Sequence, residues 1–191
     1  MKALRALTTT VLSLGAACVL AGCGGAKDEY YRLSATGPAT VRSSGIAVGI
    51  GPVNLPTYVD RAELVFQSSA NKFEIPAKVR WAGSLADNFS QVLAADIGRH
   101  LNSGNVVANP AANDTRLRYR VSVNVRQFHA VSGQEAILEA DWRVETPDSR
   151  QVLRHGDGLY HAPIRGDGYG PVVAAESDLV EQLAGAISRM L

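Results

Sequence analysis

Residues 116–128 read RLRYRVSVNVRQF and alternate apolar with polar side chains along nearly their whole length. Because successive side chains of a strand point to opposite faces, this alternation predicts a β-strand with one buried face. The buried face would hold Leu117, Tyr119, Val121, Val123 and Val125. The opposite face would carry a row of arginines, namely Arg116, Arg118, Arg120 and Arg126, together with Ser122 and Asn124.

Two segments downstream repeat the pattern. Residues 136–146 and 151–160 each read as a strand, and turn sequences separate the three segments: VSGQ at 131–134 and PDS at 147–149. Strands joined by such short connections pair as antiparallel neighbours. The sequence therefore predicts a three-stranded antiparallel meander.

Shorter strands are expected upstream. In residues 44–53 the apolar residues alternate with Ala47, Gly49 and Gly51, which predicts a strand approached closely by another backbone or a helix. Residues 62–67 and 72–75 predict a hairpin around the turn sequence SSAN, and residues 30–33 predict a first short strand.

Two segments have helical periodicity. In residues 84–101 Ser84 can cap the N-terminus, and Asn102-Ser103-Gly104 supplies the stop. A second helix begins with Pro171 in its first turn and runs to the C-terminus. The predicted fold is therefore α+β, with an antiparallel or mixed β-sheet and two α-helices packed on one face. The apolar stripe of the first helix holds Leu85, Phe89, Val92, Leu93, Ile97 and Leu101, opposite Asn88, Gln91, Asp96 and Arg99.

The N-terminus has the three parts of a secretory signal peptide. Lys2 and Arg5 precede an uncharged run at 6–20, which is shorter than the roughly 20 residues of a membrane-spanning helix. The run ends in Leu20-Ala21-Gly22-Cys23, which resembles the lipobox of bacterial lipoproteins, where the cysteine is acylated. We therefore expect residues 1–22 to be a lipoprotein signal peptide, 23–29 a lipidated Cys23 with a short tether, and 30–191 a single α+β periplasmic domain.

Processing at Cys23 sets the composition of the exported chain. It would leave 169 of the 191 residues with a formal charge of −1 in place of +1, which gives no basic field for nucleic acid. Cys18 would leave with the signal peptide, so no cysteine would remain for a disulfide, a metal or a nucleophile. The acyl chains on Cys23 would attach the chain to a membrane. Gly24 follows Cys23, where an aspartate would retain a lipoprotein at the inner membrane, so we expect the outer membrane.

Catalytic patterns are missing from the sequence. The four histidines, His100, His129, His155 and His161, are scattered as expected of surface residues, without the spacing of metal ligands. No G-x-S-x-G nucleophile elbow is present. We therefore expect no enzyme activity, no metal and no cofactor.

One loop has the chemistry of a docking site. Leu55, Pro56, Tyr58, Asp60 and Arg61 combine prolines that bound a loop with an aromatic ring and a charge pair, which is typical of binding hot spots. The alternative is that the loop simply packs the sheet against a helix. The next candidates are Arg80 and Trp81. The arginine row is either an ordinary solvated face or a contact surface for an acidic partner or for lipid head groups.

The same residues carry a family resemblance. VGIGPV at 48–53, the docking loop, residues 71–75, RWA at 80–82 and VAAES at 173–177 after Tyr169 resemble the PqiC/YmbA family of ABC-type transport auxiliary lipoproteins. Membership implies a non-enzymatic auxiliary subunit that docks an MCE-domain protein of an intermembrane lipid-transport system to the outer membrane, on its periplasmic face. Lipid and a second copy of the chain stay open as further partners. The alternative function is a structural or regulatory envelope lipoprotein that contacts peptidoglycan synthesis or secretion machinery.

Overall fold

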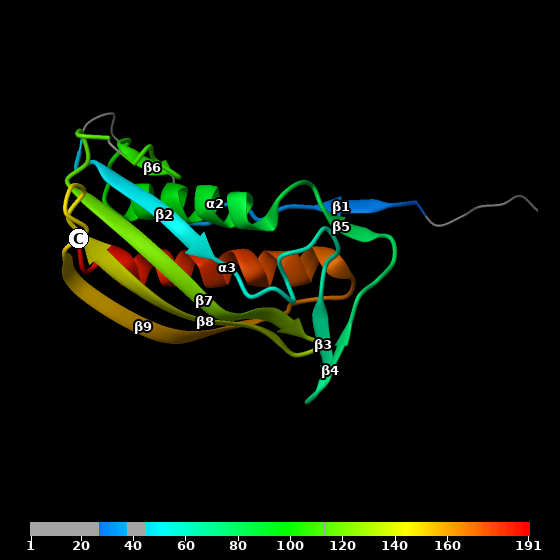
Figure 1. Cartoon of the computed structure of the whole chain (residues 1–191). Helices are drawn as coiled ribbons and strands as arrows, with labels where there is room; N and C mark the ends of the chain where they lie inside the picture. The colour runs from blue at the N-terminus through cyan, green and yellow to red at the C-terminus, as the bar shows by residue number, and fades with distance from the viewer. Residues whose placement is uncertain (1–26, 38–44, 113) are drawn as a thin grey trace, which may run out of the picture.

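The computed structural model describes residues 27–37, 45–112 and 114–191 (Figure 1). Its central strand, β7, is flanked on one side by β8 and then β9, all antiparallel, which confirms the predicted meander. On the other side β2 and then β6 run parallel to their neighbours, so the sheet is mixed. The bounds are β2 Val48–Asn54, β6 Val106–Ala108, β7 Tyr119–Val131, β8 Glu135–Glu145 and β9 Val152–Pro163.

A hairpin extends the sheet at one end. Strand β3 (Phe66–Ser69) pairs antiparallel with β4 (Lys72–Glu74), which confirms the predicted hairpin, although its first strand lies at 66–69 in place of 62–67. β3 also pairs parallel with the last residues of β7. Nearby, β1 (Glu29–Tyr31) pairs parallel with β5 (Val79–Trp81) in a separate two-stranded sheet. All four strands therefore lie at the end of the molecule where the described chain begins (Figure 1).

Both described helices cover the same face of the sheet (Figure 1). Helix α2 (Leu85–His100) packs on β2 and β6, whereas α3 (Tyr169–Ser188) packs on β8 and β9. The predicted cap is present, since the Ser84 hydroxyl accepts a hydrogen bond from the Asp87 amide at 3.2 Å. The α+β class and the two helices on one face are thus confirmed.

Strand β7 departs from simple alternation at a bulge. Its inward side chains are Val121, Val123 and Val125 before the bulge, and Phe128 and Ala130 after it. Phe128 then meets Phe89 of α2 edge to face, with ring centroids 5.3 Å apart. Two successive exposed residues, Arg126 and Gln127, absorb the change of parity, which odd–even alternation could not predict.

The glycines of β2 are explained by a close approach, as expected. A Cβ on Gly49 would lie 2.6 Å from Pro110 Cγ and 2.7 Å from Leu117 Cδ1. Gly51 has φ +137°, a conformation that L side chains rarely adopt, and Asn109 Oδ1 crowds its Cβ direction at 2.9 Å. The approaching elements are side chains of a loop and of the segment before β7, so no helix is involved.

Candidate docking surface

The loop that follows β2 is a compact turn. The Val59 and Asp60 amides both donate to the Pro56 carbonyl, at 3.1 and 3.2 Å, and the Arg61 amide donates to the Val59 carbonyl at 2.8 Å. Val59 is buried, and Leu55 is partly buried against the core. The turn is therefore fixed by its own backbone and by one inward anchor.

Tyr58 replaces a missing stretch of strand beside β7. The pairing of β2 with β7 ends at Asn124, and the pairing of β3 with β7 begins at Ala130. In the interval, the Phe128 amide donates to the Tyr58 hydroxyl at 3.1 Å. An unpaired buried amide would be costly, so this side chain does what a neighbouring carbonyl does elsewhere along the edge.

A chain of hydrogen bonds continues from Tyr58. The Gln67 amide group donates to the Ala70 carbonyl at 2.9 Å, which leaves its oxygen to accept from His129 Nε2 at 3.1 Å. His129 Nδ1 is then free to accept from the Tyr58 hydroxyl at 2.9 Å. This arrangement requires a neutral imidazole, and burial accordingly lowers the pKa of His129 and raises the pKa of Tyr58.

His129 corrects a sequence-based expectation. It was expected among scattered surface histidines, but it is buried, because the hairpin and the docking loop cover this end of β7. Its ring lies edge to face with Tyr58 and with Phe73 of β4, at centroid distances of 5.8 and 5.2 Å. Phe73 and Tyr58 are 5.0 Å apart, so three rings pack together. Phe73, Gln67 and His129 were missed because only the fold brings them to the loop.

The other predicted docking residues divide into exposed and buried groups. Asp60 and Arg61 are exposed, and Arg61 forms an ion pair with Glu63 at 3.0 Å, which lowers the pKa of Glu63. Arg80 is partly buried and lies across an isolated bridge from Glu63. Trp81 is only 6% exposed and belongs to the hydrophobic core.

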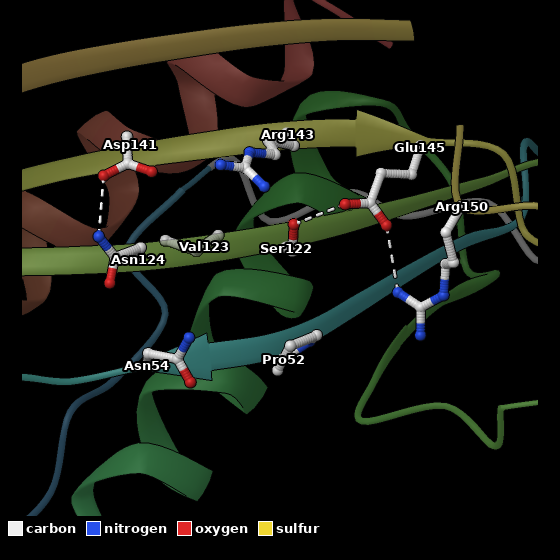
Figure 2. Close-up of a pocket in the computed structure, with 9 residues that line it drawn as sticks. All are labelled: Pro52, Asn54, Ser122, Val123, Asn124, Asp141, Arg143, Glu145 and Arg150. Atoms are coloured by element: carbon white, nitrogen blue, oxygen red, sulfur yellow. Dashed lines mark hydrogen bonds and ion pairs between the residues drawn. The ribbon is translucent and has the colours of Figure 1, made fainter. Parts of the chain in front are cut away.

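The open face of the sheet carries a shallow hollow of about 380 Å³ between β2, β7 and β8 (Figure 2). On one side of the hollow, Glu145 accepts a hydrogen bond from the Ser122 hydroxyl at 3.1 Å and forms an ion pair with Arg150 at 3.2 Å. Asn124 donates to Asp141 at 2.9 Å on the other side. The lining is therefore mixed in charge and largely paired within itself.

The arginine row does not form a continuous basic surface. Arg126 lies at the bulge of β7, 3.0 Å from both Glu139 and Asp141, because β8 places these acidic residues opposite its neighbours Gln127 and Asn124. Arg120 is buried and donates to the Ala111 carbonyl. Arg116, which precedes β7, pairs with Asp114 at 2.9 Å. This pattern favours the ordinary solvated face over a surface for acidic partners.

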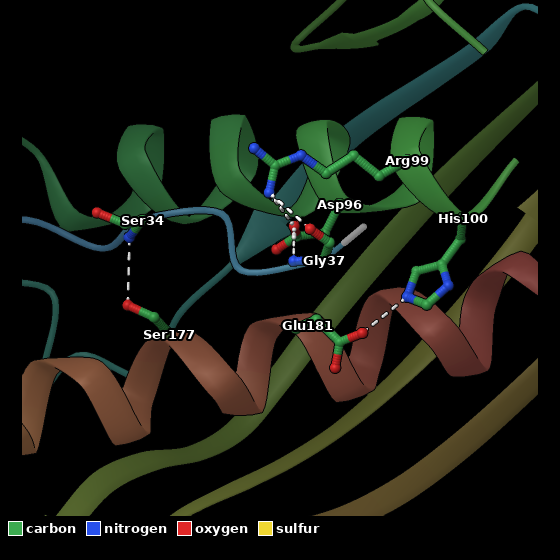
Figure 3. A network of polar contacts seen from close by, with 7 residues as sticks. All are labelled: Ser34, Gly37, Asp96, Arg99, His100, Ser177 and Glu181. Atoms are coloured by element: carbon green, nitrogen blue, oxygen red, sulfur yellow. Dashed lines mark hydrogen bonds and ion pairs between the residues drawn. The ribbon is translucent and has the colours of Figure 1, made fainter. Parts of the chain in front are cut away.

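A strap formed by residues 33–37 joins the N-terminal strand to the helices (Figure 3). The Ser34 amide donates to the Ser177 hydroxyl at 3.2 Å, and the Gly37 amide donates to Asp96 Oδ1 at 2.9 Å. Asp96 was expected on the polar face of its helix, opposite the apolar stripe, but it is buried beneath the strap, and Ser177 is buried as well. Burial in turn raises the pKa of Asp96.

Glu176 is a second buried carboxyl group on α3. It is 2% exposed, and burial raises its pKa to about 8, so at neutral pH it is mostly protonated. Burial is the main cause of the raised pKa of the Tyr58 phenol, and at the alkaline pH where that phenol ionises the charge of Glu176 raises it further. The carboxyl group therefore lies on the side of the core that supports the docking loop.

The described ranges hold no group of three or more histidine, cysteine, aspartate or glutamate residues arranged to bind a metal. Among the helices of those ranges, none is long and apolar enough to cross a membrane. Cys23, the predicted lipidation site, and the predicted signal peptide lie outside the described residues.

The mixed sheet and the two helices on one face define an α+β domain, whose loop after β2 is fixed to β7 by Tyr58. Residues 31–188 match the family of ABC-type transport auxiliary lipoprotein components, and the chain belongs to that family. It is 26% identical over 187 residues to the intermembrane transport lipoprotein PqiC of Escherichia coli K12 and to that of Shigella flexneri, covering 91% of this chain and 92% of either relative.

Solved structures share the fold. Protein XCC0632 from Xanthomonas campestris is similar with a TM-score of 0.65 and 14% identity, over 83% of this chain and 91% of that one. The crystal structure of an uncharacterised protein gives a TM-score of 0.68 at 18% identity, over 86% and 98% of the two chains. At these identities the likeness establishes the architecture alone.

Proposed function

We propose that this chain is an auxiliary subunit of an MCE/ABC-type intermembrane lipid-transport system, anchored to the periplasmic face of the outer membrane. In this proposal residues 1–22 are the signal peptide, 23–29 the acylated tether and 30–191 the periplasmic domain. The observation that carries it is the likeness to PqiC over 91% of this chain, which includes the docking loop. The subunit acts by binding, without catalysis.

Its docking surface is the loop of Leu55, Pro56, Tyr58, Asp60 and Arg61, with Arg80 beside it. The loop is held rigid by the hydrogen bonds of Tyr58, so little conformational entropy is lost when a partner binds. Asp60 and Arg61 present opposite charges to solvent, where they can select a partner. Trp81 belongs to the hydrophobic core and is left out of this surface.

Charge reversal tests the docking surface. We expect the tagged protein, extracted from membranes, to co-purify with an MCE-domain protein, and Asp60→Arg or Arg61→Glu to reduce that recovery strongly. Asp148→Arg and Arg143→Glu reverse matched exposed charges away from the loop and should leave recovery unchanged. Equal recovery by all four variants would refute the site. Recovery of peptidoglycan-synthesis proteins alone would refute the transport function.

Sorting tests the anchor separately. Cys23→Ser should abolish labelling with radioactive fatty acid and release the domain from the membrane fraction, because no acyl chain remains. Gly24→Asp should keep the label but move the protein to the inner-membrane fraction of a density gradient. An unchanged distribution of Gly24→Asp would contradict the role given to that position.

A further inference from the structure

Three large apolar side chains are exposed at the end of the molecule where the described chain begins. Tyr30 of β1 is 61% exposed, Phe73 of β4 is 41% exposed, and Ile75 just beyond β4 is 43% exposed. We call the two hairpin residues, Phe73 and Ile75, the anchor-end patch; Tyr30 lies at the same end on the neighbouring β1. Apolar side chains gathered at one end of a domain often mark a contact with a partner or a membrane.

Several contacts show that β1 and the β3–β4 hairpin lie at the same end of the molecule. The Glu29 amide donates to the Lys78 carbonyl at 2.8 Å, which places the start of β1 beside the chain that follows the hairpin. The Tyr169 ring lies 6.4 Å from that of Tyr31 and 6.3 Å from that of Phe66. Since Phe66 pairs with the end of β7, β1 and the hairpin flank the same end of the sheet (Figure 1).

The length of chain before β1 limits how far this end can stand from its anchor. Residues 24–28 separate Cys23 from Glu29, and six extended residues span only about 20 Å. The acyl chains on Cys23 would therefore hold β1 and the neighbouring hairpin close to the bilayer surface.

We propose that the anchor-end patch rests on the bilayer that holds the acyl chains of Cys23, in the interfacial layer between head groups and hydrocarbon. This inference depends on the anchoring stated under Proposed function. Phenylalanine and other large apolar side chains bind at that layer by burying their apolar surface in it. The tether also makes the contact intramolecular, so even weak apolar binding is well populated at the resulting effective concentration.

The patch is rigid enough to orient the domain. Phe73 is held between the rings of Tyr58 and His129, and β3 beside it is hydrogen-bonded to β7. Seating Phe73 on the bilayer would consequently place the docking loop next to the membrane surface. A transport partner bound there would have its end close to the destination bilayer.

A tryptophan at the patch tests the contact. The acylated chain that begins at Cys23 and carries Phe73→Trp would be reconstituted into vesicles of phosphatidylethanolamine and phosphatidylglycerol with brominated acyl chains, which quench tryptophan on contact. The native Trp81 and Trp142 are 6% and 4% exposed, and the wild-type chain measures their background. Leu153→Trp is the control, because Leu153 is similarly exposed at 45% and lies near the opposite end of the β7–β8 pair, roughly 35 Å away.

We expect brominated lipid to reduce the fluorescence of Phe73→Trp but not that of Leu153→Trp. Ile75→Trp repeats the test should Phe73→Trp fold poorly, as judged by circular dichroism. Unquenched patch variants on chains that still float with the vesicles would overturn the membrane contact and leave the anchor intact. Chains that do not float with the vesicles would overturn both the membrane contact of the patch and the anchoring through Cys23. Acrylamide, a water-soluble quencher, gives a second readout. If the introduced tryptophan is protected from acrylamide only after the MCE-domain protein is added, the patch contacts that protein and not the bilayer.

Discussion

Strand β2 and the docking loop cover successive parts of the same edge of β7, but by different means. β2 pairs with β7 through its backbone and contributes Val48 and Ile50 to the core. The loop is held to β7 chiefly by the hydroxyl of Tyr58. The difference teaches that one side chain can fix a loop while its neighbours Asp60 and Arg61 stay exposed to solvent.

The largest effect is expected in β2. Ile50 is fully buried against the helices, so Ile50→Ala should lower the free energy of unfolding by about 2–5 kcal/mol through lost burial and a cavity. Denaturant unfolding measures it. Val107→Ala, at an exposed site of the neighbouring β6, should change little. A small effect at Ile50 would mean that β2 is no more firmly held than the loop.

The next effect is a pH dependence of the free energy of unfolding, and it arises from Glu176 of α3. Burial raises the pKa of Glu176 to about 8, so between the ordinary glutamate pKa of 4.5 and 8 the folded chain keeps a proton that the unfolded chain releases. Stability contributed by this group is complete below pH 4.5 and is lost as pH rises toward 8, by roughly 1 kcal/mol per pH unit.

Glu176→Gln has no proton to lose and should flatten that decline. Denaturant unfolding at several pH values between 5 and 8 measures the stability difference from wild type, which should grow with pH. Asp178→Asn, at an exposed position of the same helix, is the control and should show no such growth. Parallel profiles for wild type and Glu176→Gln would mean that Glu176 is ionised in the folded state.

A smaller effect is expected for the hydroxyl of Tyr58. Tyr58→Phe leaves the Phe128 amide and His129 Nδ1 without their partner, so it should lower the free energy of unfolding by about 1–3 kcal/mol. Amide hydrogen exchange at Phe128 should accelerate, while exchange at Ile50 in β2 follows only the global loss. Tyr30→Phe removes an exposed hydroxyl and should be neutral. Unchanged exchange at Phe128 would show that the loop needs no tyrosine hydroxyl.

Local patterns predicted the regular part of this fold. The alternation in residues 116–128 and the cap at Ser84 depend on neighbours in sequence, and the helix formed as expected, while the strand formed at Tyr119–Val131, later in the chain than predicted. Strands β5 and β6 have three residues each, too few to show any period, and were not predicted. The parallel pairing of β2 with β7 arises from tertiary packing, which local periodicity does not encode.

The candidate site was predictable in part for the same reason. Its loop stood out by prolines, an aromatic ring and charges that are adjacent in sequence. The partners of Tyr58 lie about 70 positions away, at Phe128 and His129, so its structural role is invisible before the chain folds. The burial of Trp81, Asp96 and Ser177 likewise depends on segments that cover them only in the folded chain.

The smallest effect on stability, and the most decisive for function, is expected at Arg61. Its ion pair with Glu63 is exposed, and such pairs add little to stability, so Arg61→Ala should leave the unfolding midpoint unchanged. The same variant should weaken co-purification of the MCE-domain protein, whereas Arg143→Ala on the open sheet face should not. Loss of binding without loss of stability would separate docking from folding within one loop. If Arg61→Ala changes neither, the loop serves only to cover β7, as Tyr58 already does.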